Sequence, residues 1–134
     1  MIIGVGADIL QIERLRRSLA KFGKGYLEEV YSEDELATAI PPSYLTEAEF
    51  HSRAFCAKEA CSKALGTGID ENVDWYDIII DQLSQPPKIT LFGGALTRLE
   101  TLTPPNFQAH IALTVGGNDG IASAYVVISA QAQG

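Results

Sequence analysis

Residues 55–69, which read FCAKEACSKALGTGI, constrain the fold more than any other part of this chain. A helix turns by about 100° per residue, and over this stretch that spacing gathers small and apolar side chains on one arc. Small side chains let a helix approach a sheet or another helix closely, so this arc is predicted to be buried. A helix stop is predicted at Gly66, because glycine is common directly after helices. The buried arc comprises Cys56, Ala57, Ala60, Cys61, Ala64 and Leu65.

The opposite arc of this helix is polar and is predicted to face water, a partner or a ligand. It holds Lys58, Glu59, Ser62 and Lys63. One interpretation is an ordinary surface pair between Glu59 and Lys63, worth about 0.2–0.5 kcal/mol to the helix. The other is a ligand site, because a carboxylate, two ammonium groups and the backbone N–H donors of a glycine turn at residues 66–68 suit a phosphorylated ligand with a divalent ion.

Length and hydropathy favour one domain over residues 1–134. With 46% hydrophobic residues, the chain has enough apolar side chains for a core. No apolar run reaches the roughly 18 residues that a bilayer crossing needs. The short apolar start at residues 1–5 lacks the charged lead and cleavage pattern of a signal peptide. We therefore expect a cytoplasmic protein without a membrane partner.

Charge and cysteine content exclude several classes of protein. The formal net charge of −7 argues against a nucleic-acid partner, which would require a basic surface. Cys56 and Cys61 lie five residues apart in one predicted helix. This spacing matches neither a disulfide framework nor a metal-binding Cys-x-x-Cys pattern. Both cysteines are therefore interpreted as packing residues.

Basic side chains are concentrated near the start of the chain, in a second predicted helix at residues 9–22. Gly23 is placed to end this helix. Arg14, Arg17 and Lys21 share one of its faces, opposite the apolar residues. This stripe is either a solvated helix face or a docking site for an acidic partner, since complementary charge steers encounter.

Asp8 directly follows a short β-rich run at residues 2–5. Gly4 and Gly6, on either side of Val5, would permit close approach by another backbone. The carboxylate of Asp8 is either the N-cap of the helix that follows or a metal ligand at the edge of a site, and the two roles are compatible.

The remaining elements indicate an α+β fold. Ser32 with Glu35, and Thr46 with Glu49, have capping-box spacing. The first pair predicts a short helix, and the second predicts that the long helix begins near Glu47 and runs to Leu65. Further elements follow the glycine turn: strands at residues 75–80, 88–92, 108–115 and 121–129, and a helix at 93–102.

Several motifs occur together in a characteristic order. GVGADI at residues 4–9 and YSEDEL at residues 31–36 precede AKEA at residues 57–60 and SKALGTGI at residues 62–69. With these motifs the chain resembles the holo-acyl-carrier-protein synthases, the small 4'-phosphopantetheinyl transferases. The resemblance implies a long helix packed on a mainly antiparallel sheet. It also implies Mg²⁺-dependent transfer of phosphopantetheine from coenzyme A to a serine of an apo acyl or peptidyl carrier protein, with release of adenosine 3',5'-bisphosphate.

The resemblance also implies roles for particular residues. Asp8 and Glu59 match the family's two metal-binding carboxylates, and Lys63 matches its lysine near the coenzyme phosphates, so these three form the expected catalytic set. Lys58 and the turn of Gly66, Thr67 and Gly68 match positions that contact the coenzyme. The stripe of Arg14, Arg17 and Lys21 falls on the helix that grips the carrier. Three subunits associate in this family, with active sites between neighbours.

The sequence departs from the family pattern at several positions. Ala54 replaces the family arginine, with Arg53 one residue earlier, and residues 85–87 read QPP where the family has Gly-Lys-Pro. Near the C-terminus, His110 is kept but Ala112 and Val115 replace a serine and a second histidine, which predicts slower transfer.

Three interpretations therefore remain open after the sequence alone. The first is a working transferase. The second is a catalytically impaired homologue that binds a carrier or a synthase without transfer. The third is a generic acidic α+β binding domain in which Asp8 is only a cap and Glu59 with Lys63 is only a salt bridge.

Overall fold

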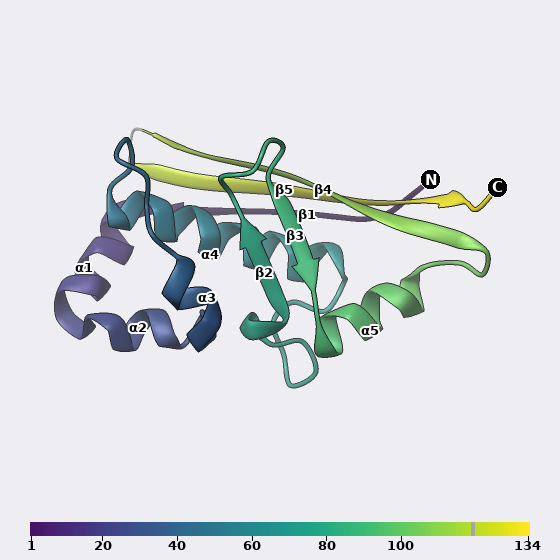
Figure 1. Ribbon diagram of the computed structural model, residues 1–134, viewed down its shortest axis with the longest axis horizontal. Coiled ribbons are helices and arrows are strands. Elements are labelled where there is room, and N and C mark those ends of the chain that lie inside the picture. The colour runs from purple at the N-terminus through teal and green to yellow at the C-terminus, as the bar shows by residue number, and fades with distance from the viewer. Residues whose placement is uncertain (119) are drawn as a thin grey trace.

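The computed structural model describes residues 1–118 and 120–134 and has two antiparallel sheets with helices packed beneath the larger one (Figure 1). The larger sheet has strand order β1-β5-β4, and β2 and β3 form a hairpin. The predicted α+β fold is confirmed. The elements are β1 Ile2–Gln11, α1 Ile12–Phe22, α2 Lys24–Glu28, α3 Glu33–Thr38, α4 Glu47–Ala64, the 3₁₀ turn η1 Trp75–Asp77, β2 Ile78–Asp81, β3 Lys88–Leu91, α5 Gly93–Leu102, β4 Phe107–Asn118 and β5 Ile121–Ala132.

Helix α4 packs closely against β1, as its small residues predicted. A Cβ atom at Gly6 would collide with the carbonyl oxygen of Ala60, and one at Gly4 would collide with that of Ala64. The predicted buried residues of α4 are buried, including both cysteines. Thr46 begins the helix with both hydrogen bonds of the predicted capping box, so local sequence and packing agree on where α4 starts.

The other face of the larger sheet is exposed and carries large apolar side chains on β1 and β5. Alternate residues of β5 are buried beneath the sheet, whereas those between them point away from α4. Val5 is 65% exposed, Ile9 67% and Tyr125 56%. Figure 1 shows the helices gathered on the opposite side of these strands. Among residues 1–118 and 120–134, no helix or strand covers this face of the sheet.

The N-terminal prediction needs correction. Strand β1 runs to Gln11 rather than ending at residue 5, so Asp8 lies within a strand, opposite Ala124 of β5. Helix α1 begins at Ile12 with Gln11 at its N-cap position. The interpretation of Asp8 as a helix cap is wrong, because pairing with β5 extends the strand beyond the local β-rich run.

Later elements match the predictions more closely. Helix α5 has the predicted bounds. The strand predicted at residues 75–80 instead begins as η1 and becomes β2 at Ile78. Within the described ranges, no helix combines the length and hydropathy that a bilayer crossing requires.

Candidate active site

Asp8 and Glu59 line the same cavity, although one lies on β1 and the other on α4. The cavity has a volume of about 480 Å³. Its apolar wall includes Tyr26, Phe55 and Trp75, whose rings pack in sequence with centroid distances of 5.8 Å and 6.3 Å. The site therefore places two carboxylates beside an aromatic surface.

Lys63 lies one helical turn beyond Glu59 and reaches across to β1. Its ammonium donates to the Asp8 carboxylate at 3.1 Å and to the backbone oxygen of Ala7 at 3.1 Å. The Lys63 side chain is half exposed. The three residues of the predicted catalytic set are therefore gathered at one place, with a cation able to meet an incoming anion.

The carboxylate of Glu59 is in an unfavourable environment. Partial burial raises its pKa, the nearby charge of Asp8 raises it further, and Lys63 opposes both effects. The Cys56 thiol is buried next to this pair, and burial with the charge of Asp8 raises its pKa to about 12. Cys56 therefore stays a neutral packing residue, and a cation bound between the carboxylates would relieve their repulsion.

The donor set fits Mg²⁺ that is shared with a ligand. The described residues contain no group of three or more histidine, cysteine or carboxylate side chains that could hold a metal ion. Two carboxylates match the usual protein contribution to Mg²⁺, which takes its remaining ligands from water and phosphate oxygens. Asp8 and Glu59 would hold such an ion only weakly without a phosphorylated ligand.

Lys58 does not lie on an exposed arc, and this prediction is wrong. Its side chain is fully buried, and its ammonium pairs with Glu35 at 2.7 Å. Ser62 is also buried and donates to the backbone oxygen of Glu59 at 2.7 Å. The prediction of one buried and one exposed arc was wrong because the sheet covers one side of α4 and α1 and β2 cover others.

The glycine turn after α4 uses its backbone donors internally. The N–H groups of Thr67 and Gly68 both donate to the oxygen of Ser62, and that of Gly66 donates to the oxygen of Lys63. These donors are therefore not free for phosphate, contrary to the prediction. The turn needs glycine because φ is +83° at Gly66 and +67° at Gly68.

Arg98 supports this turn and was not found from the sequence. Its Nε donates to the oxygen of Leu65 at 2.8 Å, at the end of α4. The contact joins residues 33 positions apart, so no local pattern could have indicated it. Arg98 adds a half-buried cation next to the predicted coenzyme-binding turn.

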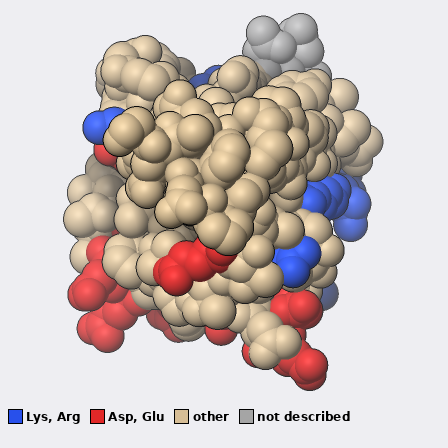
Figure 2. Space-filling model, turned by 90° about the vertical axis from the view of Figure 1, so that its right-hand side faces the viewer, with Lys and Arg blue, Asp and Glu red and all other residues tan. Residues whose placement is uncertain are grey.

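Arg14, Arg17 and Lys21 are exposed on α1, as predicted. Arg17 lies 3.5 Å from the Glu13 carboxylate in an exposed pair. Figure 2 shows the opposite end of the molecule, which carries α5: most of its surface is uncharged, acidic side chains lie along its lower edge, and a few basic side chains lie at its sides. The basic stripe is therefore a local feature of an acidic protein.

Of the C-terminal family positions, His110 and Ala112 lie on the other face of the sheet from Asp8, whereas Val115 lies in the same row as Asp8, on the far side of Ala124. Exposure alternates along β4, and His110 and Ala112 belong to the exposed series that points away from α4. Asp8 belongs to the series of β1 that faces α4. Val115 is partly buried opposite Ala124. His110 is therefore not placed to act as a proton acceptor beside Asp8 of the same chain.

Arg53, which stands one residue before the family arginine position, donates to the oxygen of Gly117 at 2.8 Å and so ties α4 to β4. The turn after β4 could bring Asn118 or Asp119 close to the position of the missing histidine, but their side chains lie outside those that the structure describes.

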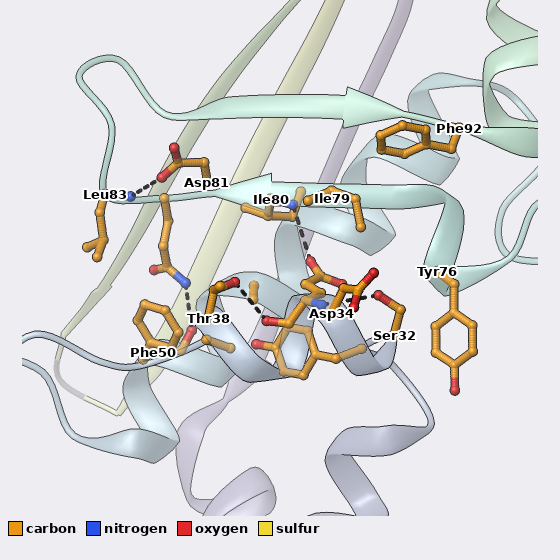
Figure 3. A pocket seen from close by; sticks show the side chains of 15 residues that line it. Ser32, Asp34, Thr38, Phe50, Tyr76, Ile79, Ile80, Asp81, Leu83 and Phe92 are labelled. Carbon is orange, nitrogen blue, oxygen red and sulfur yellow. Dashed lines mark hydrogen bonds between the residues drawn. The ribbon is translucent and has the colours of Figure 1, made fainter.

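A second and larger cavity, of about 610 Å³, lies between α3, the start of α4 and the β2–β3 hairpin (Figure 3). Phe50, Tyr76 and Phe92 line it together with acidic side chains that include Asp34 and Glu35. The described residues that line it include no lysine or arginine, so this cavity is unsuited to phosphate.

Comparison with known proteins decides the family. A family model described as "4'-phosphopantetheinyl transferase superfamily" matches residues 4–115. The chain belongs to this superfamily. It is 42% identical over 133 residues to the holo-[acyl-carrier-protein] synthase of Rhodopseudomonas palustris strain TIE-1, a match that covers 97% of this chain and 91% of the relative. The recognition of a transferase of the holo-acyl-carrier-protein synthase type is confirmed, and the non-catalytic alternative is not favoured.

Solved structures agree with this assignment. The synthase of Helicobacter pylori, determined in complex with coenzyme A, has a TM-score of 0.73 at 28% identity, covering 93% of this chain and 99% of that one. The synthase of Neisseria meningitidis has a TM-score of 0.76 at 28% identity, covering 96% and 99%. The transferase fold is therefore shared along almost the whole length of each chain.

Proposed function

We propose that this transferase moves 4'-phosphopantetheine from coenzyme A to a serine of an apo acyl or peptidyl carrier protein, depends on Mg²⁺ and releases adenosine 3',5'-bisphosphate. The observation that carries the proposal is the meeting of Asp8 and Glu59 in one cavity, with Lys63 bonded to Asp8. A phosphorylated ligand would complete the metal coordination that two carboxylates leave open.

The two carboxylates and the lysine of the site have different tasks in this reaction. Asp8 and Glu59 would hold Mg²⁺, which when bound neutralises the pyrophosphate and polarises the phosphorus under attack. The ammonium of Lys63 stabilises charge that develops on the phosphate oxygens. The serine hydroxyl loses its proton to water and its oxygen forms a bond to the β-phosphorus of coenzyme A. The bond from that phosphorus to the bridging oxygen breaks in line, and this oxygen leaves as part of adenosine 3',5'-bisphosphate.

Coenzyme and carrier would approach from different sides. The turn of Gly66, Thr67 and Gly68 contacts the coenzyme through its outer surface. Its N–H groups do not take part, because they are already bonded within the turn. The exposed stripe of Arg14, Arg17 and Lys21 docks the acidic carrier by complementary charge. Lys58 is excluded from both tasks by its burial.

A homotrimer with shared active sites would explain two features of the isolated chain. The exposed apolar sheet face around Val5, Ile9 and Tyr125 has the character of an interface core. His110 points away from the chain's own Asp8 and Glu59, which suits a role in a neighbour's site. Sedimentation of the wild type and of Tyr125→Glu tests this, because the charge should dissociate the trimer.

Product analysis tests the proposed reaction. Incubation with coenzyme A, Mg²⁺ and an apo carrier should release adenosine 3',5'-bisphosphate in the same molar amount as modified carrier, and EDTA should prevent the release. Release of a different nucleotide, or full activity in EDTA, would contradict the proposal.

A further inference from the structure

Lys58 uses its whole hydrogen-bonding capacity inside the protein. Its ammonium donates to the carboxylate of Glu35 at 2.7 Å, to the backbone oxygen of Val30 at 3.0 Å and to that of Trp75 at 3.0 Å. A lysine ammonium has three donors, and here all three have acceptors. One side chain on α4 thereby joins the segment after α2, helix α3 and the turn η1.

These contacts place Lys58 between the two cavities. Val30 and Trp75 both line the cavity that contains Asp8 and Glu59. Glu35 lines the larger cavity, where its second oxygen accepts a bond from the Ile80 N–H at 3.4 Å (Figure 3). Lys58 directly precedes Glu59 in the helix. The same helical turn therefore carries a carboxylate of the site and the side chain that binds Val30 and Trp75 in the cavity wall.

Stability alone does not account for this arrangement. Both side chains are buried, that of Lys58 completely and that of Glu35 to all but 6%, so both charges are held away from water. Replacing a buried ion pair by apolar residues of similar size is often neutral or stabilising. An apolar pair could not, however, bind two backbone carbonyl groups that converge from separate segments.

We propose that Lys58 is a positioning residue, which holds Val30 and Trp75 at a fixed distance from Glu59 and so sets the shape of the cavity that receives substrate. The kinetic part of this inference rests on the proposed transfer reaction. Its structural part does not, because Trp75 is the only tryptophan of the chain and reports on the wall directly.

The test compares Lys58→Met/Glu35→Met with the wild type. The double variant removes both charges and therefore leaves no unpaired buried ion. Acrylamide quenching of Trp75 fluorescence should increase in the isolated protein. The KM for the apo carrier or for coenzyme A should rise by about tenfold or more, because small displacements of a binding wall have large effects. The kcat should change much less, since Asp8, Glu59 and Lys63 are retained.

Tyr31→Phe is the matched control. It removes another buried hydrogen bond of the same core, between the Tyr31 hydroxyl and His51 Nδ1 at 2.8 Å, and keeps the ring that lies near Lys58. Loss of stability without a change in quenching or KM is expected. Equal changes in quenching and KM for the control and the double variant would show a general loss of rigidity and overturn the proposal.

Glu35→Gln decides the question if the double variant does not fold. Its amide oxygen can still accept from the Lys58 ammonium, and both carbonyl bonds remain. The free energy of unfolding should fall because the buried ammonium loses its counter-ion, whereas quenching and KM should stay at wild-type values, and an increase in both would overturn the proposal. Wild-type protein that transfers nothing would contradict the proposed function instead, and the quenching comparison would still test the role of Lys58.

Discussion

The ammonium of Lys63 lies 3.1 Å from the carboxylate of Asp8, although 55 residues separate them in the chain. Strand β1 and helix α4 pack against each other, and the glycines of β1 allow the close approach that makes this contact possible. The contact leaves Glu59, on the same helix, without an ion-pair partner in the described part of the chain. Four predictions follow from this unequal pairing and from its surroundings.

Glu59→Gln should abolish transfer and yet stabilise the metal-free protein at pH 7. The variant removes a partly buried carboxylate that Asp8 repels. The rate of transfer should fall by at least about 100-fold, because mutation of residues that only orient metal ligands already lowers metal affinity or activity by about 10- to 100-fold. Thermal unfolding without metal, alongside a transfer assay, measures both effects. Glu29→Gln is the control, since Glu29 lines the same cavity but is exposed; transfer that survives in Glu59→Gln would rule out its assigned role.

The stabilising effect of Glu59→Gln should disappear in acid. A raised pKa means that the folded state holds the proton more tightly than the unfolded chain does, so ionisation of Glu59 costs stability as pH rises through that pKa. The difference in unfolding free energy between variant and wild type should be present at neutral pH and vanish below the ordinary pKa of glutamate. Metal binding should weaken over the same interval as the carboxylate becomes protonated. A difference in unfolding free energy that grows on acidification would contradict a raised pKa of Glu59.

Lys63→Met should separate rate from metal affinity. Loss of a cation aimed at developing phosphate charge should reduce kcat by about 10²- to 10³-fold. Removal of the ammonium also frees the Asp8 carboxylate, so Mg²⁺ affinity should be equal to or higher than that of the wild type. Calorimetric titration with Mg²⁺ and coenzyme A measures the second quantity. Weaker Mg²⁺ binding in Lys63→Met would contradict this prediction and would indicate that Lys63 orients the Asp8 carboxylate for the metal.

Arg14→Glu and Arg17→Glu should weaken carrier recognition and leave the metal site intact. We expect kcat/KM for the carrier to fall by about tenfold at low salt and to differ less at high salt, because complementary charge acts mainly on association. Lys88→Glu makes the same change of charge on the β2–β3 hairpin and should have little effect. Equal losses in all three variants would remove the special role of α1.

Local features of the fold were predictable from the sequence. Thr46 and Glu49 form the full capping box because both partners lie within one helical turn. Ser32 also caps its helix, but the Glu35 side chain does not complete the second box, since Lys58, 23 residues away, binds it instead. A pattern over four residues cannot reveal such a distant competitor.

Motifs in the sequence indicated candidate residues for the site but not all of their geometry. Asp8, Glu59 and Lys63 were identified from motifs, and their convergence depends on pairing between β1 and β5 and on packing of α4. Lys58 was misplaced because a helical pattern with one polar arc normally has one solvent-facing side. Helix α4 is covered on several sides, which only the tertiary structure could show.

The mass of an apo acyl carrier protein after incubation with this protein, coenzyme A and Mg²⁺ is the most direct test of the account. A gain of roughly 340 Da on the carrier's serine, absent with EDTA and absent with Glu59→Gln, is the predicted result for one phosphopantetheine arm transferred in line. An unchanged mass with several acyl and peptidyl carriers, under conditions where coenzyme A binds, would contradict the proposed transfer.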